Sequence, residues 1–444
     1  MNFPVYDSYR QSGVEWLGAI PFNWQTMRLG RLLVRAFNGT TTTQVEPCET
    51  TVPVTRIETI SGGRLNLNKV GHIPQSEARP NMRLRAGDIL FSHINSLSMI
   101  GNCAIFRGGE PLYAGMNLLT LRPSTDVHAG WLHWVLQASS MRQIIAAMAK
   151  PAINQASIPQ SSLLSVMTPV PHPAEQAAIA AFLDRETGKI DALLEAQKRL
   201  IELLKEKRQA VISHAVTKGL DPAAPMKEAG VEWLGQVPAH WEVKPLRSFA
   251  KLVTGLTPPS EDTSLYADDA EGHPWLRPED LDEQGLPSTA SRTLTDEGIA
   301  LCRSVQARSS LVCCIGTIGK VGFVKEPVAT NQQITAIQPS ARHRFIYHAL
   351  IAARAEMEAS AVGNVLRILN SARLGNIHLP LPPLGEADAI SAHIDCLTAV
   401  TDELCDHAEA AIVLLKERRA ALISAAVTGK IDVRGLAPEQ AEAA

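Results

Sequence analysis

A long internal repeat constrains the fold of this chain more than any other feature. GVEWLGAIPFNW at 13–24 recurs as GVEWLGQVPAHW at 230–241, which is 217 positions later. EQAAIAAFLD at 175–184 and LLKEKRQAVISHAVT at 203–217 recur 211 positions later as EADAISAHID and LLKERRAALISAAVT. Four of the seven Trp lie in the first pair of segments, so chance does not explain the match. The chain is therefore two copies of one unit.

Each half has the same internal order: an opening motif with two Trp, a variable middle, a Pro-rich segment and a helical block. The Pro-rich segments TPVPHP (168–173) and LPLPPLG (379–385) mark boundaries, because Pro ends strands and is tolerated only at helix starts. The opening Trp residues are expected to anchor packing rather than to stack on bases. The predicted domains are 1–170 (globular, opening motif 13–24), 174–218 (helix), 225–384 (globular, opening motif 230–241), 385–432 (helix) and 433–444 (C-terminal tail).

The two helical blocks carry apolar residues at steps of three and four, close to the 3.5-residue period of a coiled coil. A long amphipathic helix cannot bury its apolar stripe alone, and the available partner is its own copy in the other half. We therefore predict an antiparallel helix pair, with two ordinary helices packed on separate domains as the alternative. The predicted core of the pair is Leu183, Ile190, Leu193, Leu200, Leu204, Val211, Ile394, Leu397, Leu404, Ala408, Ala411, Leu415 and Leu422.

The variable middles have β-branched runs and turn signals. Examples are AGDILFSHI and NLLTLRP in the first and SLVCCIGTIGKVGFV in the second. A helical stretch follows the strands in each middle, at 131–149 and 345–359. The predicted fold class is α+β: two β-rich globular domains with helices, separated by two long antiparallel coiled-coil helices in a pseudo-two-fold repeat. Two domains with one frame and different residues suggest one task performed on two targets.

The chain has 45% apolar residues, 20% charged residues and a net charge of −3. This is the composition of a soluble globular protein. It excludes a disordered chain, a collagen and a small disulfide scaffold, and its overall charge argues against a nucleic-acid binder. The regional charges differ. Residues 1–173 carry +5, 174–221 carry 0, 222–384 carry −2 and 385–444 carry −6. The first middle is thus basic, and in the second one basic side chains outnumber acidic ones over 303–373.

The seven Cys are scattered without a C-x-x-C pair, which indicates reduced thiols. Asp7 and Arg10 lie where a signal peptide would need an apolar segment. Apolar helical runs such as the one at 410–415 are only a few residues long. A membrane span needs about 20 apolar residues, far more than this run offers. We therefore expect a soluble cytoplasmic protein with no membrane association.

The combined motifs resemble the specificity (S) subunit of type I DNA restriction-modification systems. The matching features are GVEWLG-x-x-P-x-x-W opening each half, GTIGKVGFV and ATNQQ in the second half, P-x-P-x-x-EQ at the first Pro-rich segment, and LLKEKRQAVISHAVT. The resemblance extends over roughly 12–432. The chain departs from the pattern at EADAI (386–390), SMIGN (98–102) and AGMN (114–117), which puts strict equivalence of the two halves in doubt.

The resemblance implies a non-catalytic subunit that recognises double-stranded DNA. Each globular domain would be a target-recognition domain that reads one half of a bipartite site. The helices would set the spacing and dock two methyltransferase (M) subunits, which methylate one adenine in each half-site, and two motor-nuclease (R) subunits would complete the restriction complex. The resemblance also implies S-adenosylmethionine, ATP and magnesium in the partner subunits, with no cofactor bound by this chain.

The motifs of several enzyme classes are absent from the sequence. No N-P-P-Y-type tetrapeptide of an adenine methyltransferase occurs, and no G-x-G-x-x-G loop occurs. GTIGK at 316–320 fails the P-loop pattern, because Cys314 and Val321 stand where Gly and Ser or Thr are required. His393, Cys396, Cys405 and His407 do not share one helix face, so no metal site is expected.

Reading of base edges requires forked donors and acceptors, such as Arg for guanine and Asn or Gln for adenine. Each such residue has an ordinary alternative as a solvated side chain or a phosphate contact. The shared Asn331-Gln332-Gln333 motif in particular favours a structural role. The candidates are Arg56, Arg64, Lys69, His93, Asn95, Asn117, Asn154, Gln155, Arg277, Lys320, Asn331, Gln332, Gln333, Asn364, Arg367 and Asn370.

Three other functions remain open on the sequence alone. The chain could be a coiled-coil scaffold whose two modules bind protein or sugar, and strong salt dependence of DNA binding would argue against it. It could be a DNA-binding protein without partner subunits. A fused nuclease with an unrecognised active site is the third alternative, and nuclease activity of the purified chain would support it.

Overall fold

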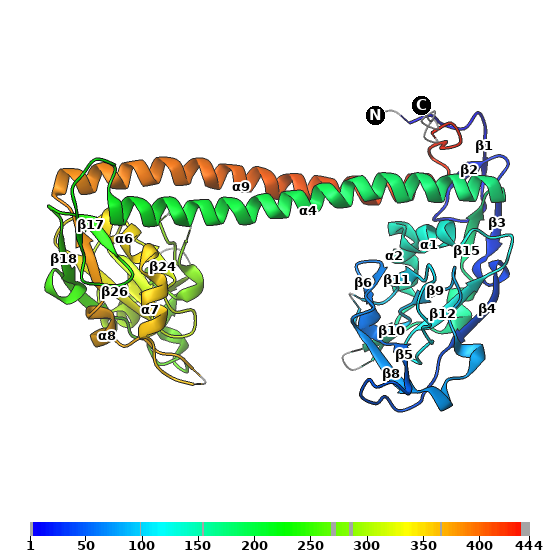
Figure 1. Ribbon diagram of the computed structural model, residues 1–444, viewed down its shortest axis with the longest axis horizontal. Coiled ribbons are helices and arrows are strands. Elements are labelled where there is room, and N and C mark those ends of the chain that lie inside the picture. The colour runs from blue at the N-terminus through cyan, green and yellow to red at the C-terminus, as the bar shows by residue number, and fades with distance from the viewer. Residues whose placement is uncertain are drawn as a thin grey trace. The chain divides into compact units, whose positions relative to one another are not determined.

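The computed structural model describes residues 3–436 except 98, 153–154, 268–271, 284–286 and 365. The chain divides into two compact units: unit 1 comprises residues 1–196 and 411–444, and unit 2 comprises 197–410. Two long helices, α4 (Pro173–Lys218) and α9 (Leu384–Val427), each begin in one unit and end in the other (Figure 1). Each unit therefore contains a globular part, the beginning of one long helix and the end of the other.

The globular part of unit 1 is built around the antiparallel sheet β11-β9-β12-β4. Alternate residues of β9 face opposite sides. Ile89 and Phe91 join the core that contains α1, whereas Leu90 joins a second core on the other face. The strands are β1 (Tyr9–Gln11), β2 (Ala19–Pro21), β3 (Gln25–Arg28), β4 (Leu33–Asn38), β5 (Thr51–Thr55), β6 (Ile60–Ser61), β7 (Arg64–Leu65), β8 (Val70–Pro74), β9 (Ile89–Phe91), β10 (Ile94–Asn95), β11 (Cys103–Ile105), β12 (Leu119–Pro123), β13 (Lys150–Ala152), β14 (Gln155–Ser157) and β15 (Met167–Val170). The helices are α1 (Ala129–Gln137), α2 (Ser139–Ala147) and α3 (Gln160–Leu164).

Unit 2 contains an equivalent antiparallel sheet, β19-β26-β23-β24, and a second four-stranded sheet, β20-β22-β21-β25. Val312 faces the core that contains α6, and its neighbours Leu311 and Cys313 face the other core. The strands are β16 (Met226–Glu228), β17 (Gln236–Pro238), β18 (Glu242–Pro245), β19 (Ala250–Thr254), β20 (Tyr266–Ala267), β21 (His273–Leu276), β22 (Arg292–Leu294), β23 (Ser310–Cys313), β24 (Val321–Phe323), β25 (Ala329–Thr330), β26 (Ile334–Pro339) and β27 (His378–Leu381). The helices are α5 (Asp296–Ala300), α6 (His343–Ala352), α7 (Arg354–Ser360) and α8 (Ser371–Gly375).

The opening motif forms the same small hairpin in both units, β1 with β2 and β16 with β17. The last Gly of GVEWLG has φ +60° at Gly18 and +57° at Gly235, a conformation that a side chain disfavours. The following Trp is buried in each copy, with 1% of Trp24 and 0% of Trp241 exposed. These requirements of the backbone and core explain why the motif is nearly identical in the two halves.

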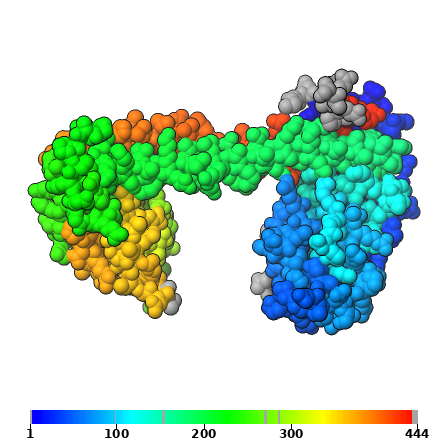
Figure 2. All heavy atoms as spheres, in the orientation of Figure 1, coloured from blue at the N-terminus to red at the C-terminus, as the bar shows by residue number. Residues whose placement is uncertain are grey.

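The buried Trp of each motif packs against the end of a long helix in the same unit. A Cβ at Gly219, just after α4, would lie 3.3 Å from the Trp241 ring, and a Cβ at Gly429, just after α9, would lie 3.2 Å from the Trp24 ring. In unit 1 the segment after α9 also reaches the N-terminal residues, since Asp432 N donates to Pro4 O (2.8 Å). Figure 2 shows these N-terminal residues in dark blue beside the red C-terminal segment.

The two long helices run antiparallel, as reciprocal ion pairs in the two units indicate (Figure 1). In unit 1, Arg419 Nε on α9 lies 2.9 Å from Asp191 Oδ1 on α4. In unit 2, Arg208 Nε on α4 lies 3.4 Å from Asp402 Oδ1 on α9. Arg208 and Arg419, like Asp191 and Asp402, are 211 positions apart. The same pair thus occurs once in each unit with the helices exchanged.

Over 187–211 of α4 and 398–422 of α9, most of the buried and partly buried positions form a heptad seam in one shared register. In α4 the seam is Thr187, Ile190, Leu194, Gln197, Ile201, Leu204, Arg208 and Val211. In α9 it is Thr398, Thr401, Cys405, Ala408, Ile412, Leu415, Arg419 and Leu422, each 211 positions after its counterpart. Of the predicted core residues, Leu183, Ile190, Leu204, Ile394, Ala408 and Leu422 are buried, and Val211, Ala411 and Leu415 are partly buried.

The prediction of the core is wrong at four leucines, which are 40–50% exposed: Leu193, Leu200, Leu397 and Leu404. Each precedes a seam position by one residue. The neighbouring seam residues are Leu194, Ile201, Thr398 and Cys405, and three of these are themselves apolar, so hydrophobicity alone does not distinguish the two adjacent positions. The predicted core thus agrees with the seam at Ile190, Leu204, Val211, Ala408, Leu415 and Leu422 and departs from it at these four leucines.

The mixed helix and strand content and the long helix α4 between the units confirm the α+β prediction. Among the described residues, no helix is long and apolar enough to cross a membrane.

The seam predicts opposite outcomes for two adjacent leucines of α4. Leu204 is 8% exposed and Leu203 is 45% exposed. We expect Leu204→Ala to lower the stability of unit 2 by about 2–3 kcal/mol, since it removes a buried side chain and leaves a cavity. Leu203→Ala is the matched control and should change stability by less than about 0.5 kcal/mol. Thermal unfolding of the two variants measures both, and equal losses would contradict the assigned register.

Candidate nucleic-acid interface

Three candidate residues of unit 1 are exposed on the part of the globular domain that carries β5 and β8. Arg56 follows β5, Lys69 precedes β8, and Thr59 Oγ1 donates to Lys69 O (2.7 Å), which ties the two segments together. Arg56 Nε lies 3.5 Å from a carboxylate oxygen of Glu58. Asn117 is exposed in the loop before β12. Figure 1 shows β5 and β8 at the end of this globular part farthest from α4.

The pairing of β10 with β14 brings together three further candidates: His93, Asn95 and Gln155. Only Gln155 is exposed. His93 is 6% exposed, and its Nε2 lies 3.3 Å from Asn38 Nδ2. Burial lowers the pKa of His93, so the ring is neutral at pH 7. Asn95 uses both ends of its amide, donating to Ser92 Oγ (3.1 Å) and accepting from Ser96 N (2.8 Å). Asn154 lies outside the described residues.

Arg64 occupies a different part of the unit from these residues. It lies on β7 and donates from Nη2 to Asp191 Oδ2 on α4 (3.2 Å). Arg64 therefore connects a hairpin of the globular part to the long helix, while its side chain stays 76% exposed.

In unit 2, Arg277 and Lys320 lie together but are largely held by the protein. Arg277 Nη1 lies 2.9 Å from Glu279 Oε1, and Nη2 donates to Ser291 Oγ (2.9 Å). Lys320 Nζ donates to Pro278 O (3.0 Å). Arg277 also occupies the same local position as Arg56: each precedes a 3₁₀ turn with φ near −118° and pairs with a Glu two residues later. The segments TRIET (55–59) and LRPED (276–280) share the pattern Arg-x-Glu, which alignment of the longer repeats does not reveal.

The Asn331-Gln332-Gln333 motif forms a local turn. Asn331 is 6% exposed, donates from Nδ2 to Gln333 Oε1 (2.9 Å) and accepts from Gln333 N (3.1 Å). Gln332 is exposed and accepts from Thr257 Oγ1. Gly255 lies so close to Thr330, the residue before Asn331, that a Cβ at position 255 would be 2.1 Å from Thr330 O. These contacts favour a structural role for Asn331.

The remaining candidates of unit 2 lie in the segment before α8. Asn364 and Arg367 are exposed, and Arg367 donates to Glu358 O. Asn370 caps α8, since its Oδ1 accepts from Arg373 N (2.9 Å). Asn370 therefore has a structural use that the sequence did not indicate.

A group of arginines in unit 1 was absent from the candidates. Arg35 of β4 and Arg122 of β12 are directly opposite each other, so their side chains lie on one face of the sheet. Both guanidinium groups approach the Phe37 ring, Arg35 at 4.1 Å and Arg122 at 5.4 Å. Arg122 forms two hydrogen bonds with Asp88, both 2.7 Å. Arg35 donates to Asn81 O (3.3 Å), which places Arg79 and Arg83 in the adjoining segment.

Asp88 neutralises the charge of only one arginine of this group, Arg122. Within the described part of the chain, no ion pair joins a carboxylate to Arg35, Arg79 or Arg83. Arg79 and Arg83 are exposed, and Arg35 is partly so. Like charges directly opposite on a sheet are destabilising, so the Arg35–Arg122 pair favours a site for an anion. Sequence spacing did not reveal it, because residues 35, 79–83 and 122 meet only through strand pairing.

The described residues contain no group of three or more His, Cys, Asp or Glu side chains that could hold a metal ion. His393 and Cys396 are exposed and Cys405 is buried, so these helix residues do not converge.

Comparison with known proteins identifies the class to which this fold belongs. The family model described as "Type I restriction modification DNA specificity domain" matches residues 238–412. The putative type I restriction enzyme MjaX specificity subunit of Methanocaldococcus jannaschii is 29% identical over 427 residues, covering 94% of this chain and 96% of that protein. The EcoKI specificity subunit of Escherichia coli K12 is 25% identical over 227 residues, covering 51% of this chain and 46% of that protein.

Two solved structures share the fold. One comes from work on complex assembly and conformational transition of the type I R-M system, with a TM-score of 0.72, 15% identity and coverage of 92% of this chain and 98% of that chain. The other is the HsdS subunit from Thermoanaerobacter tengcongensis, with a TM-score of 0.52, 16% identity and coverage of 93% and 98%. Residues 238–412 match the type I specificity-domain family, and most of the chain is similar to a type I restriction enzyme specificity subunit. The resemblance inferred from its motifs is thereby confirmed.

Proposed function

We propose that each globular part is a target-recognition domain that reads one half of a bipartite DNA site. The proposed domain limits are 1–170 and 225–384, with 174–218 and 385–432 as spacer helices and 433–444 as a tail. The observation that carries the proposal is the combination of one repeated frame with different exposed residues. Sheets, opening hairpins and helix ends recur in both units, whereas the exposed Gln155 of unit 1 is matched 211 positions later by the exposed apolar Leu366 of unit 2.

The exposed candidates are the best placed to contact bases. In unit 1 these are Arg56, Lys69, Asn117 and Gln155, and in unit 2 Gln332, Asn364 and Arg367. His93, Asn95, Asn331 and Asn370 are occupied by protein contacts and serve to hold these segments in shape.

The chain performs no chemistry itself in this proposal, and it binds no cofactor. It acts in the cytoplasm within a complex of two M and two R subunits, which supply S-adenosylmethionine, ATP and magnesium chemistry. Exposed apolar side chains outside the seam support docking on the helices, because such residues are costly on a free surface. They are Leu193, Leu200, Leu203, Leu397, Val400, Leu404, Val413 and Leu414.

Methylome sequencing of cells with and without this gene tests the proposal. We expect a split motif that is methylated on adenine in both halves and that loses all methylation when the gene is deleted. Complementation with the wild-type gene should restore it, and this restoration is the control. Deletion that leaves every methylated motif in place would overturn the proposed function.

The arginine group of unit 1 predicts a phosphate contact, which carries affinity without sequence information. In the complex with its methyltransferase subunits, Arg35→Ala should weaken binding to all DNA sequences by a similar factor. It should also reduce the slope of log K against log salt by about one. Arg199→Ala is the control, since Arg199 is exposed on α4 and pairs with Glu202 (3.0 Å). An unchanged slope in Arg35→Ala would refute the phosphate contact.

A further inference from the structure

A pair of aspartates on the long helices joins each globular part to the helix pair. Asp184 on α4 and Asp395 on α9 are 211 positions apart and therefore occupy the same place in the two repeats. Both side chains are 38% exposed. The helix residues are equivalent, whereas the partners from the two globular parts are chemically different.

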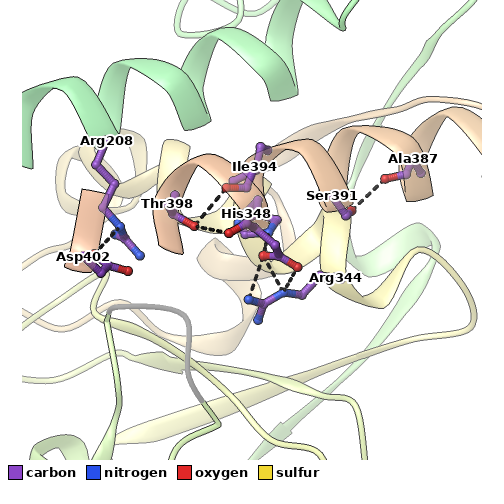
Figure 3. Close-up of polar contacts among 9 residues, drawn as sticks. Arg208, Arg344, His348, Ala387, Ser391, Ile394, Thr398 and Asp402 are labelled. Carbon is purple, nitrogen blue, oxygen red and sulfur yellow. Dashed lines mark hydrogen bonds and ion pairs between the residues drawn. The ribbon is translucent and has the colours of Figure 1, made fainter. Parts of the chain in front are cut away.

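In unit 2, Asp395 receives hydrogen bonds from two residues of α6, Arg344 and His348, which are labelled in Figure 3. Arg344 donates from Nε to both carboxylate oxygens (3.1 and 3.0 Å) and from Nη2 to Oδ1 (2.8 Å). His348 Nε2 lies 2.9 Å from the same Oδ1. This nitrogen must carry the proton, because an ionised carboxylate only accepts. Arg344 is also held over the rings of Tyr347 (4.6 Å) and Phe323 (5.2 Å).

The groups in this contact have shifted pKa values. Burial would raise the pKa of Asp395, but the hydrogen bonds from His348 and Arg344 outweigh it and lower the value to about 2. Burial lowers the pKa of His348, which keeps its ring neutral. The carboxylate is therefore charged throughout the physiological range, and the contact is a charge-assisted one.

In unit 1, the equivalent Asp184 accepts hydrogen bonds from one ring N–H and one guanidinium group. Trp134 Nε1 on α1 donates to Asp184 Oδ1 (2.9 Å), and Arg107 Nη2, which follows β11, donates to Oδ2 (3.0 Å). In chain order, β12 and β26 are the last strands of the two four-stranded sheets β11-β9-β12-β4 and β19-β26-β23-β24. The next helices in the chain are α1 and α6. Both repeats thus use an aspartate of the long helix to hold an arginine and a ring N–H from the helix that follows the four-stranded sheet in the chain.

The recurrence of this geometry with different partners indicates that the contact itself is required. A residue needed only for helix stability would not need two donors from a globular part. The donors fix both oxygens of each carboxylate, so the contact resists rotation of the globular part about the long helix. Hydrogen bonds to charged groups are also the strongest of the ordinary polar contacts.

We propose that Asp184 and Asp395 are positioning residues that restrict the spacer length between the two half-sites. This inference rests on the proposed function. One base pair more or less in the spacer moves a half-site by about 3.4 Å and rotates it by about 34° around the DNA axis. A recognition domain can follow that rotation only by turning on its helix pair, and each aspartate contact opposes this turn.

The test compares variants of the full complex of this chain with its methyltransferase subunits. Duplexes carry the wild-type motif with its own spacer or with one base pair added or removed. Asp395→Ala and Asp184→Ala should each raise methylation of the altered spacers, relative to the normal one, by about tenfold or more, because each loses at least two charge-assisted hydrogen bonds and one such bond corresponds to roughly a factor of ten. The bases required within each half-site should stay the same. Asp388→Ala is the matched control, because Asp388 is exposed on α9.

Asp395→Asn and Asp184→Asn keep the side-chain shape and provide folded variants if the alanine forms unfold, as thermal melting will show. A role in stability alone predicts less methylation at every site with an unchanged spacer preference. That result in folded variants overturns the inference and leaves the proposed function intact. Absence of any split motif with the wild-type chain overturns the proposed function, and the inference with it.

Discussion

The rest of the structure depends on the antiparallel pairing of α4 with α9. Asp191 with Arg419 in unit 1 and Arg208 with Asp402 in unit 2 are the same ion pair with the helices exchanged. Each unit consequently takes the start of one helix and the end of the other, and each buried Trp packs beside the glycine that follows a helix end.

This arrangement explains which parts of the sequence can vary. The opening hairpin must bend at glycines with positive φ and bury its Trp, so its sequence is nearly the same in both halves. The globular parts contact the helices through a few donors, and these differ: Trp134 and Arg107 in unit 1, Arg344 and His348 in unit 2. A constant frame with replaceable readers suits a protein that recognises two unlike half-sites.

The sequence predicted the repeat, the fold class and the family, because each of these rests on patterns that extend over many residues. It predicted only part of the helix seam, since Leu193 and Leu404 are apolar yet lie one position before it. It also could not distinguish an exposed amide such as Asn117 from a capping one such as Asn370, because local backbone geometry makes that difference. The arginine group around Arg35 was missed because strand pairing, rather than spacing, assembles it.

The central claim is that the two globular parts are independent readers carried by one repeated frame. Exchange of the two middles, about 25–165 and 242–375, within the full chain tests it most directly, with the methylome of cells that express the methyltransferase subunits as the measurement. The account predicts a methylated motif in which the two half-sites have changed places and the spacer is kept. An unchanged motif from a chain that folds and assembles would contradict it.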